Sequence, residues 1–153
     1  MRYIYAIPTA PTFVATGLSC YDYDPLQHEG LQIQYLDVRK GHDTFQISKK
    51  ITRVYYIASG SGYFTIANNR YDVSEGAVVE VPPGIEYSYS GTMKAIVVST
   101  PRWFRGNDRS THSNPDVGEE GTSPSAKRSV TERGLQGMGK SLVRLFRRLT
   151  SGD

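Results

Sequence analysis

His42 is followed directly by Asp43, a pairing of residue types that suits acid–base chemistry. Histidine is the usual side chain for removing a proton near neutral pH, and a carboxylate beside it can orient its ring. Adjacent residues of a strand point to opposite faces, so Asp43 can equally well lie away from the ring, and both residues can belong to a turn after Gly41. The sequence leaves both interpretations open.

Cysteine chemistry is sparse in this chain of 153 residues. Cys20 is the only cysteine, so it forms no internal disulfide, and its surroundings indicate a small buried side chain rather than a nucleophile. The three histidines are His28, His42 and His112, and their wide spacing does not match a Cys/His zinc cluster.

Short strands separated by turn residues dominate the first two thirds of the chain. Residues 31–38 begin with a period-two alternation that places Leu31, Ile33 and Tyr35 on one face of a strand. Glycines at 60 and 62 predict a hairpin turn, and Asn68-Asn69 predicts a second one. The other expected strands are residues 53–57, 63–66, 71–73, 77–81, 86–90 and 94–99. Turn signals at this spacing, without a helical period between them, predict an all-β sandwich or barrel.

Aromatic residues and charge divide the chain near residue 104. All 11 tyrosines, the tryptophan and four of the five phenylalanines precede residue 105. Basic and acidic residues balance over residues 1–104, at 9 each, whereas residues 105–153 hold 9 basic and 6 acidic residues. We therefore predict a folded domain at 1–104, a disordered linker at 105–139 and a short basic amphipathic helix at 140–149. The neutral charge of the domain argues against nucleic-acid binding.

The spacing of residues 41–87 resembles the two signature motifs of the cupin superfamily. The first motif matches as Gly41, five residues, Ile47, one residue, Lys49, three residues, Arg53, six residues and Gly60. The second matches as Gly76, five residues, Pro82-Pro83-Gly84, two residues and Tyr87. The resemblance covers about residues 31–100 and implies a small antiparallel jelly-roll barrel, commonly a homodimer.

The resemblance also implies which side chains enter the barrel. Metal-dependent cupins carry metal-binding histidines and a glutamate at the positions of Ile47, Lys49, Arg53 and Tyr87, so we expect no metal and no other cofactor. Strand alternation adds Tyr55 and Tyr89 to the inward set. The predicted ligand-binding pocket consists of Lys49, Arg53, Tyr55, Tyr87 and Tyr89. The alternative is a dry core in which Arg53 pairs with Glu80 or Glu86.

Two functions fit this pocket. Two cations and three phenols suit a small anionic metabolite, such as a sugar phosphate, a nucleotide sugar or a carboxylate, bound without catalysis. The alternative is a metal-independent sugar isomerase or epimerase, for example in surface polysaccharide biosynthesis. By resemblance to metal-free cupins that act on keto sugars, His42 would be its base and Tyr87 its proton partner. A His42 turned toward Tyr55 or Tyr87 favours the enzyme, and a solvent-facing His42 favours the binding protein.

Two further expectations concern the surroundings of the protein. Pro8 and Pro11 interrupt the first residues, and no stretch reaches the ~20 apolar residues of a membrane-spanning helix, so we expect a cytoplasmic protein. The basic helix at 140–149 would either dock to a membrane surface or a partner protein, or remain a solvated tail.

Overall fold

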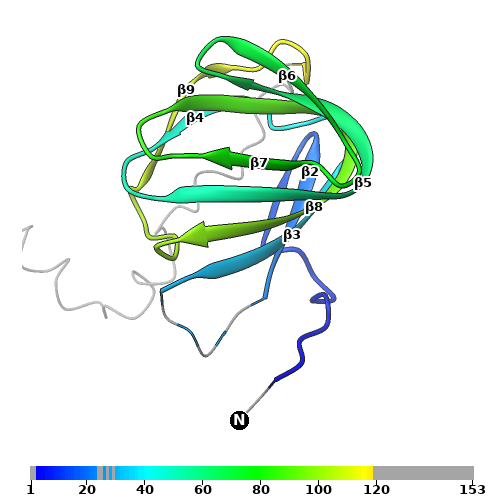
Figure 1. The fold of residues 1–153 in the computed structure, drawn as a ribbon, viewed down its shortest axis with the longest axis vertical. Helices are drawn as coiled ribbons and strands as arrows, with labels where there is room; N and C mark the ends of the chain where they lie inside the picture. The colour runs from blue at the N-terminus through cyan, green and yellow to red at the C-terminus, as the bar shows by residue number, and fades with distance from the viewer. Residues whose placement is uncertain (1–2, 24–25, 27, 29, 119–153) are drawn as a thin grey trace, which may run out of the picture. The chain divides into compact units, whose positions relative to one another are not determined.

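The computed structural model describes residues 3–23, 26, 28 and 30–118, and within these ranges the regular structure is antiparallel β-sheet (Figure 1). The strands of this part are β1 (Phe13–Ala15), β2 (Leu18–Asp22), β3 (Gln32–Val38), β4 (Thr44–Ser48), β5 (Thr52–Ile66), β6 (Asn69–Ser74), β7 (Val78–Val81), β8 (Glu86–Thr100) and β9 (Asp108–Ser113). The all-β prediction is confirmed. Among the described residues, no helix could cross a membrane. The helix predicted at 140–149 lies outside the described residues.

Two strands of 15 residues, β5 and β8, form the frame of the barrel. They pair from Thr52 opposite Thr100 to Ile66 opposite Tyr87. The first half of β5 also pairs with β7, and its second half pairs with β6. On the other side, β8 pairs with β3, which leads to β2 and β1, and with β4, which leads to β9. Figure 1 shows both long strands curving, so that one bent sheet wraps around a common interior in a jelly-roll arrangement.

Glycines allow the two long strands to bend together. The pairing of β5 with β8 shifts between Ile57 and Ser59, and beyond this shift Gly62 lies opposite Gly91. A Cβ on Gly91 would lie 2.5 Å from the Cα of Gly62, and Gly91 has a φ of 138°. Residues 60–62 are therefore a bend within β5, and the hairpin predicted there is wrong. The turn predicted at Asn68-Asn69 is confirmed, because β5 and β6 form a hairpin around Asn68.

The more deeply buried face of β3 is not the face that carries Ile33 and Tyr35. Leu36 and Val38 are 5% and 1% exposed, and Gln32 is also buried, whereas Ile33 and Tyr35 are only half-buried. The amide of Gln34 donates a hydrogen bond of 2.5 Å to the Asp22 carboxylate of β2. The predicted alternation between the two faces of this strand is present, but this part of the barrel interior includes polar side chains.

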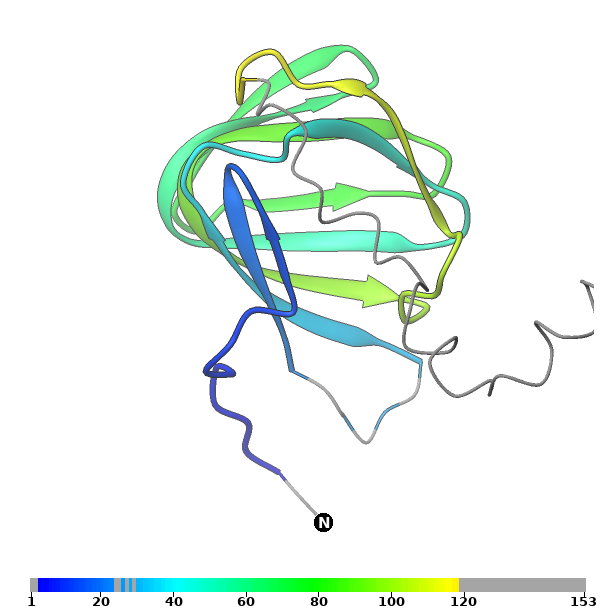
Figure 2. The same cartoon turned by 180° about the vertical axis from the view of Figure 1, so that it is seen from behind.

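The sheet extends beyond the domain boundary predicted at residue 104. Strand β9 pairs with β4, with Asp108 opposite Ser48 (Figure 2). Asn107, Asn114 and Val117 are buried. The boundary is corrected to include residues up to 118, and the remaining linker residues, 119–139, lie outside the described ranges. Aromatic content misplaced the boundary because this last segment is fixed by polar side chains and backbone hydrogen bonds rather than by large apolar groups.

Candidate functional site

Three tyrosines from the two long strands meet inside the barrel. Tyr55 comes from β5, Tyr87 and Tyr89 come from β8, and all three are buried. The hydroxyl oxygens of Tyr55 and Tyr87 are 2.7 Å apart. The rings of Tyr55 and Tyr89 pack edge to face at 5.7 Å, and Phe64 packs against both at 5.0 and 5.1 Å. The sequence placed these three tyrosines together, as the structure does.

Arg53 lies in the same interior, but a carboxylate that the sequence analysis did not consider neutralises it. Its guanidinium is 2.7 Å from Oδ2 of Asp108, and only 9% of its side chain is exposed. Glu80 is exposed, and Glu86 lies 3.7 Å from the ring of His112, so neither predicted partner pairs with Arg53. A buried cation needs a compensating charge, and Asp108, at the start of β9, supplies it for Arg53.

The carboxylate of Asp108 is the centre of a dense polar network. Its Oδ2 accepts hydrogen bonds from Arg53 and from the indole nitrogen of Trp103, at 2.7 and 2.8 Å. Its Oδ1 accepts hydrogen bonds from Ser48 and Asn107, at 2.6 and 2.8 Å. Burial alone would raise the pKa of Asp108, but the hydrogen bonds from Arg53, Ser48 and Trp103 and the charge of Arg53 lower it. The pair is therefore ionised and internally balanced.

The hydrogen bonds around Tyr87 fix the direction in which the tyrosine hydroxyls donate. Its oxygen accepts from the Arg53 guanidinium at 3.3 Å and from the Gln46 amide at 3.0 Å. Either hydroxyl can donate in the bond between Tyr55 and Tyr87, and because Tyr87 already accepts from two donors, its own proton is best placed toward the oxygen of Tyr55. The proton of Tyr55 then has no acceptor among the described residues. The Tyr89 hydroxyl likewise makes no hydrogen bond within the described part of the chain.

Burial keeps these phenols protonated. It is the largest effect on Tyr55 and Tyr89, and it raises the pKa of both well above the usual value of 10. Burial also raises the pKa of Tyr87, although the positive charge of Arg53 opposes it. Tyr55 and Tyr89 therefore present two neutral O–H donors to the interior, whereas Tyr87 is held by its neighbours.

His42 faces this cluster rather than solvent. Its ring packs edge to face on Tyr89 at 5.8 Å, and 16% of its side chain is exposed. Nδ1 lies 2.9 Å from the carbonyl oxygen of Thr44 and 3.5 Å from a carboxylate oxygen of Asp43. The N–H of Thr44 also points to Nδ1, at 3.3 Å, but the shorter contact to the Thr44 carbonyl and the nearby Asp43 carboxylate favour the tautomer that carries its proton on Nδ1. Nε2 then has a free lone pair, and it makes no hydrogen bond with the described residues.

The protonation of His42 suits a base. Burial lowers its pKa, and the opposing effects of Asp43 and of the Thr44 carbonyl do not cancel this. Nε2 can therefore accept a proton near neutral pH. Asp43 lies near the ring, as the acid–base interpretation of the sequence required. A turn after Gly41 leads into β4.

Along β4, the residues that point inward differ by one position from those that the first motif implied. Gln46 and Ser48 reach Tyr87 and Arg53, so the inward residues of β4 are 46 and 48. Lys49 is exposed in the turn after the strand and does not join the cluster. The predicted set included Lys49, and this placement is corrected. The pairing of β4 with β9 shifts between Thr44 and Gln46, where β9 holds one extra residue, so the alternation of β4 itself continues unbroken through residues 44, 46 and 48.

The residues present do not fit the metal that many cupins bind. A guanidinium already paired to Asp108 cannot serve as a ligand, and neither can the aliphatic Ile47. Among the described residues, no group of three or more His, Cys, Asp or Glu side chains is placed to hold an ion.

Comparisons with known proteins place this barrel among solved structures. No protein-family model matches the chain, and no curated protein matches it. Streptomyces Pac13, described as a unique nucleoside dehydratase, is 19% identical with a TM-score of 0.68, over 74% of this chain and 93% of Pac13. KdgF from Halomonas is 13% identical with a TM-score of 0.55, over 61% of this chain and 87% of KdgF.

A larger enzyme shares the same core. Salicylate 1,2-dioxygenase from Pseudoaminobacter salicylatoxidans, solved with gentisate, is 18% identical with a TM-score of 0.52, over 59% of this chain and 26% of the dioxygenase. Variants of Pac13 have been solved with uridine. Pac13 and the dioxygenase therefore bind small molecules. The chain has the cupin fold, as its motif spacing predicted.

Proposed function

We propose that this barrel is a metal-independent acid–base site that dehydrates a neutral nucleoside-type substrate. One observation carries the proposal: in the buried cluster, Nε2 of His42 and the hydroxyl of Tyr89 have no hydrogen-bond partner among the described residues, and the hydroxyl of Tyr55 has only Tyr87. They comprise one proton acceptor and two proton donors. A base and opposed hydrogen-bond donors are the minimum equipment for removing a proton next to a carbonyl group.

The reaction begins at His42. Nε2 removes a proton from a sugar carbon next to a carbonyl, and the O–H groups of Tyr55 and Tyr89 donate to the oxygen atoms on which negative charge develops. The electron pair of the broken C–H bond forms a C=C bond as the C–O bond at the next carbon breaks. The proton taken by His42 leaves with the departing hydroxyl as water, so the site returns to its starting protonation.

The charge of the site supports a neutral substrate over an anionic one. Arg53 is balanced by Asp108, His42 is neutral near neutral pH, and Lys49 is exposed. No cation in the cluster is left to pair with a phosphate. The sequence favoured an anionic ligand mainly because Arg53 would otherwise be an unpaired cation. Arg53 pairs with Asp108, so this reason no longer holds.

The comparison with Pac13 supports the same chemistry. The three Pac13 variants solved with uridine replace one histidine and two tyrosines. These residues have the same types and numbers as His42, Tyr55 and Tyr89, the three residues singled out here by their unpartnered groups. We therefore assign Tyr87, the catalytic candidate of the sequence analysis, to holding Tyr55 in place, and we assign proton donation to Tyr55 and Tyr89.

The test combines binding and turnover. Uridine, uridine 5′-monophosphate and ribose are titrated into the full chain by calorimetry, and uridine should bind most tightly. Uridine derivatives with a carbonyl at each sugar carbon in turn are then incubated in D2O, and products lighter by one water are sought by mass spectrometry and NMR. A chelator in parallel samples should leave the rate unchanged.

Variants assign the roles. His42→Gln should reduce the rate about 100-fold or more, as expected for a general base. Tyr55→Phe and Tyr89→Phe should each reduce it about 100- to 1,000-fold. Tyr56→Phe is the control, because Tyr56 is 47% exposed on the outer face of β5. Solvent deuterium entering the substrate without loss of water would indicate the isomerase or epimerase instead. Binding without any exchange would indicate a binding protein.

A further inference from the structure

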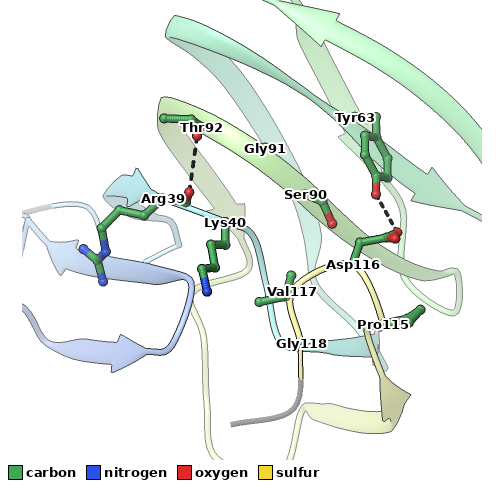
Figure 3. Close-up of a pocket in the computed structure, with 10 residues that line it drawn as sticks. All are labelled: Arg39, Lys40, Tyr63, Ser90, Gly91, Thr92, Pro115, Asp116, Val117 and Gly118. Carbon is green, nitrogen blue, oxygen red and sulfur yellow. Dashed lines mark hydrogen bonds between the residues drawn. The ribbon is translucent and has the colours of Figure 1, made fainter.

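The segment after β9 lies against β8 and against the backbone of His42, because Asn114 contacts Ser88, Ser90 and the His42 carbonyl. We call residues 114–118 the C-terminal strap. Figure 3 shows Pro115, Asp116 and Val117 of the strap beside Ser90 and Gly91 of β8. Val117 is buried, and a Cβ added to Gly41 would lie 2.9 Å from its Cγ2 atom. The strap therefore packs directly against the residue that precedes His42.

Asn114 connects the strap to the backbone of the base. Its side chain is buried, and its amide nitrogen lies 3.0 Å from the carbonyl oxygen of His42. Its backbone N–H donates to the carbonyl of Asp43 at 2.7 Å. On the other side, the N–H of His42 donates to the carbonyl of Tyr89 at 2.9 Å. The peptide groups on both sides of the imidazole are thus fixed.

The atoms around the side-chain nitrogen of Asn114 are oxygens that can accept hydrogen bonds, so this position requires a donor. Besides the His42 carbonyl, its nitrogen lies within 3.0 to 3.4 Å of the Ser88 hydroxyl, the Ser90 hydroxyl and the Tyr89 carbonyl. Its own oxygen accepts from the N–H of Asp116 at 3.1 Å. In a carboxylate of the same shape, the oxygen that replaces the amide nitrogen would face two carbonyl oxygens and could accept only from the Ser88 and Ser90 hydroxyls.

We propose that Asn114 is a positioning residue for the base: its amide holds the backbone of His42 against β8, so that the imidazole faces Tyr89. The inference rests on the proposed function for its catalytic meaning, but the placement of His42 can be measured without turnover. The strap has a second attachment, because the Tyr63 hydroxyl donates to Asp116 at 2.5 Å (Figure 3). That bond does not involve His42, which makes it a matched control.

The charged groups that act on His42 are Asp43, 3.5 Å from Nδ1, together with Arg53 and Asp108. Burial, which lowers the pKa of His42, depends on the ring staying against Tyr89. A ring that loses this position becomes hydrated, and its pKa rises toward the usual value of about 6.5. The activity of a neutral base increases as pH rises through its pKa, so the acidic limb of kcat/KM should move upward by the same amount.

The experiment uses the full chain with labelled histidine. NMR titration gives the pKa and tautomer of His42 in the wild type, Asn114→Ala, Asn114→Asp and Tyr63→Phe. We expect a wild-type pKa below 6.5 with the proton on Nδ1. In both Asn114 variants the pKa should rise and the tautomers should mix, whereas Tyr63→Phe should leave both unchanged. With an active substrate, kcat/KM should fall about 10- to 100-fold in the Asn114 variants.

An unchanged His42 pKa and tautomer in folded Asn114→Ala would overturn the proposal, as would the same change in Tyr63→Phe. If both Asn114 variants fail to give a folded spectrum, Asn114 is required for the fold and the proposal also fails. If the NMR changes occur as expected but the wild type turns over no carbonyl-bearing nucleoside, Asn114 still positions His42 and the proposed reaction is wrong.

Discussion

Replacing Asp108 by asparagine tests the internal charge balance of the barrel. Each carboxylate oxygen accepts two hydrogen bonds, Oδ1 from Ser48 and Asn107 and Oδ2 from Arg53 and Trp103. Whichever oxygen becomes an NH2 group will face two donors, and the guanidinium will lose its counter-charge. Asparagine is therefore nearly the same shape but unfavourable in either orientation.

The size of the effect follows from burial. Breaking a buried ion pair by removing one partner costs about 3–5 kcal/mol. The side chain of Asp108 is 22% exposed, so water will hydrate part of the site, and we expect a cost at or just below the lower limit of that range, about 2–3 kcal/mol. For a domain of this size, the melting temperature should fall by roughly 6–15 °C.

The assay is thermal unfolding of the full chain followed by circular dichroism. Asp72→Asn is the control, because Asp72 pairs with Arg70 at 3.1 Å on the surface with 81% of its side chain exposed, and such pairs contribute about 0–1 kcal/mol. If Asp108→Asn unfolds at the same temperature as Asp72→Asn, Asp108 does not stabilise Arg53, and the inference of a balanced interior is refuted.

The pH dependence gives a second measure of the same pair. The folded-state pKa of Asp108 is lowered, so its stabilisation is complete above the unfolded pKa of about 3.9 and is lost as pH falls through the folded value. The difference in stability between wild type and Asp108→Asn should be constant near neutral pH and shrink in strong acid.

Three further outcomes follow from the structure. A chain ending at residue 106 lacks β9 and should melt far below a chain ending at residue 118, as calorimetry would show. Gly91→Ala should cost more than about 2 kcal/mol of unfolding free energy in urea, because its Cβ meets backbone, while Gly76→Ala, with open space, should cost about 1 kcal/mol. Burial raises the pKa of Cys20 to about 12, so iodoacetamide at pH 8 should alkylate it about 1,000-fold more slowly in the folded chain than in urea.

The fold was predictable because turn residues mark it at fixed intervals. Gly76 and Gly84 both have positive φ, so the spacing of the second motif reflects backbone conformation that few other residues adopt. The same reasoning failed at Gly60 and Gly62. A glycine pair marks a sharp bend as well as a hairpin, and only the pairing of Gly62 with Gly91 on β8 distinguishes the two.

The inward positions were predictable where the motif implied the correct phase of the strand. Arg53 and Tyr55 follow from one another along β5, and Tyr87 and Tyr89 along β8. Lys49 failed because the inward residues of β4 are Gln46 and Ser48, one position away from those that the motif implied, and because Lys49 lies in the turn after the strand. No local pattern could have revealed this phase, since it depends on how β4 pairs with β8 and β9, which lie far away along the chain.

The sequence did not reveal the roles of Asp108 and Asn114, and both were overlooked for the same reason. They lie in a polar segment whose composition is typical of a linker, and they contribute through hydrogen bonds rather than through apolar area. That segment determines whether Arg53 is balanced. Without Asp108, Arg53 is an unpaired cation that demands an anion. With Asp108, the charge of Arg53 is balanced, and among the described residues the groups left for a ligand in the proposed site are one imidazole nitrogen and two phenols, which supports the neutral substrate that we propose.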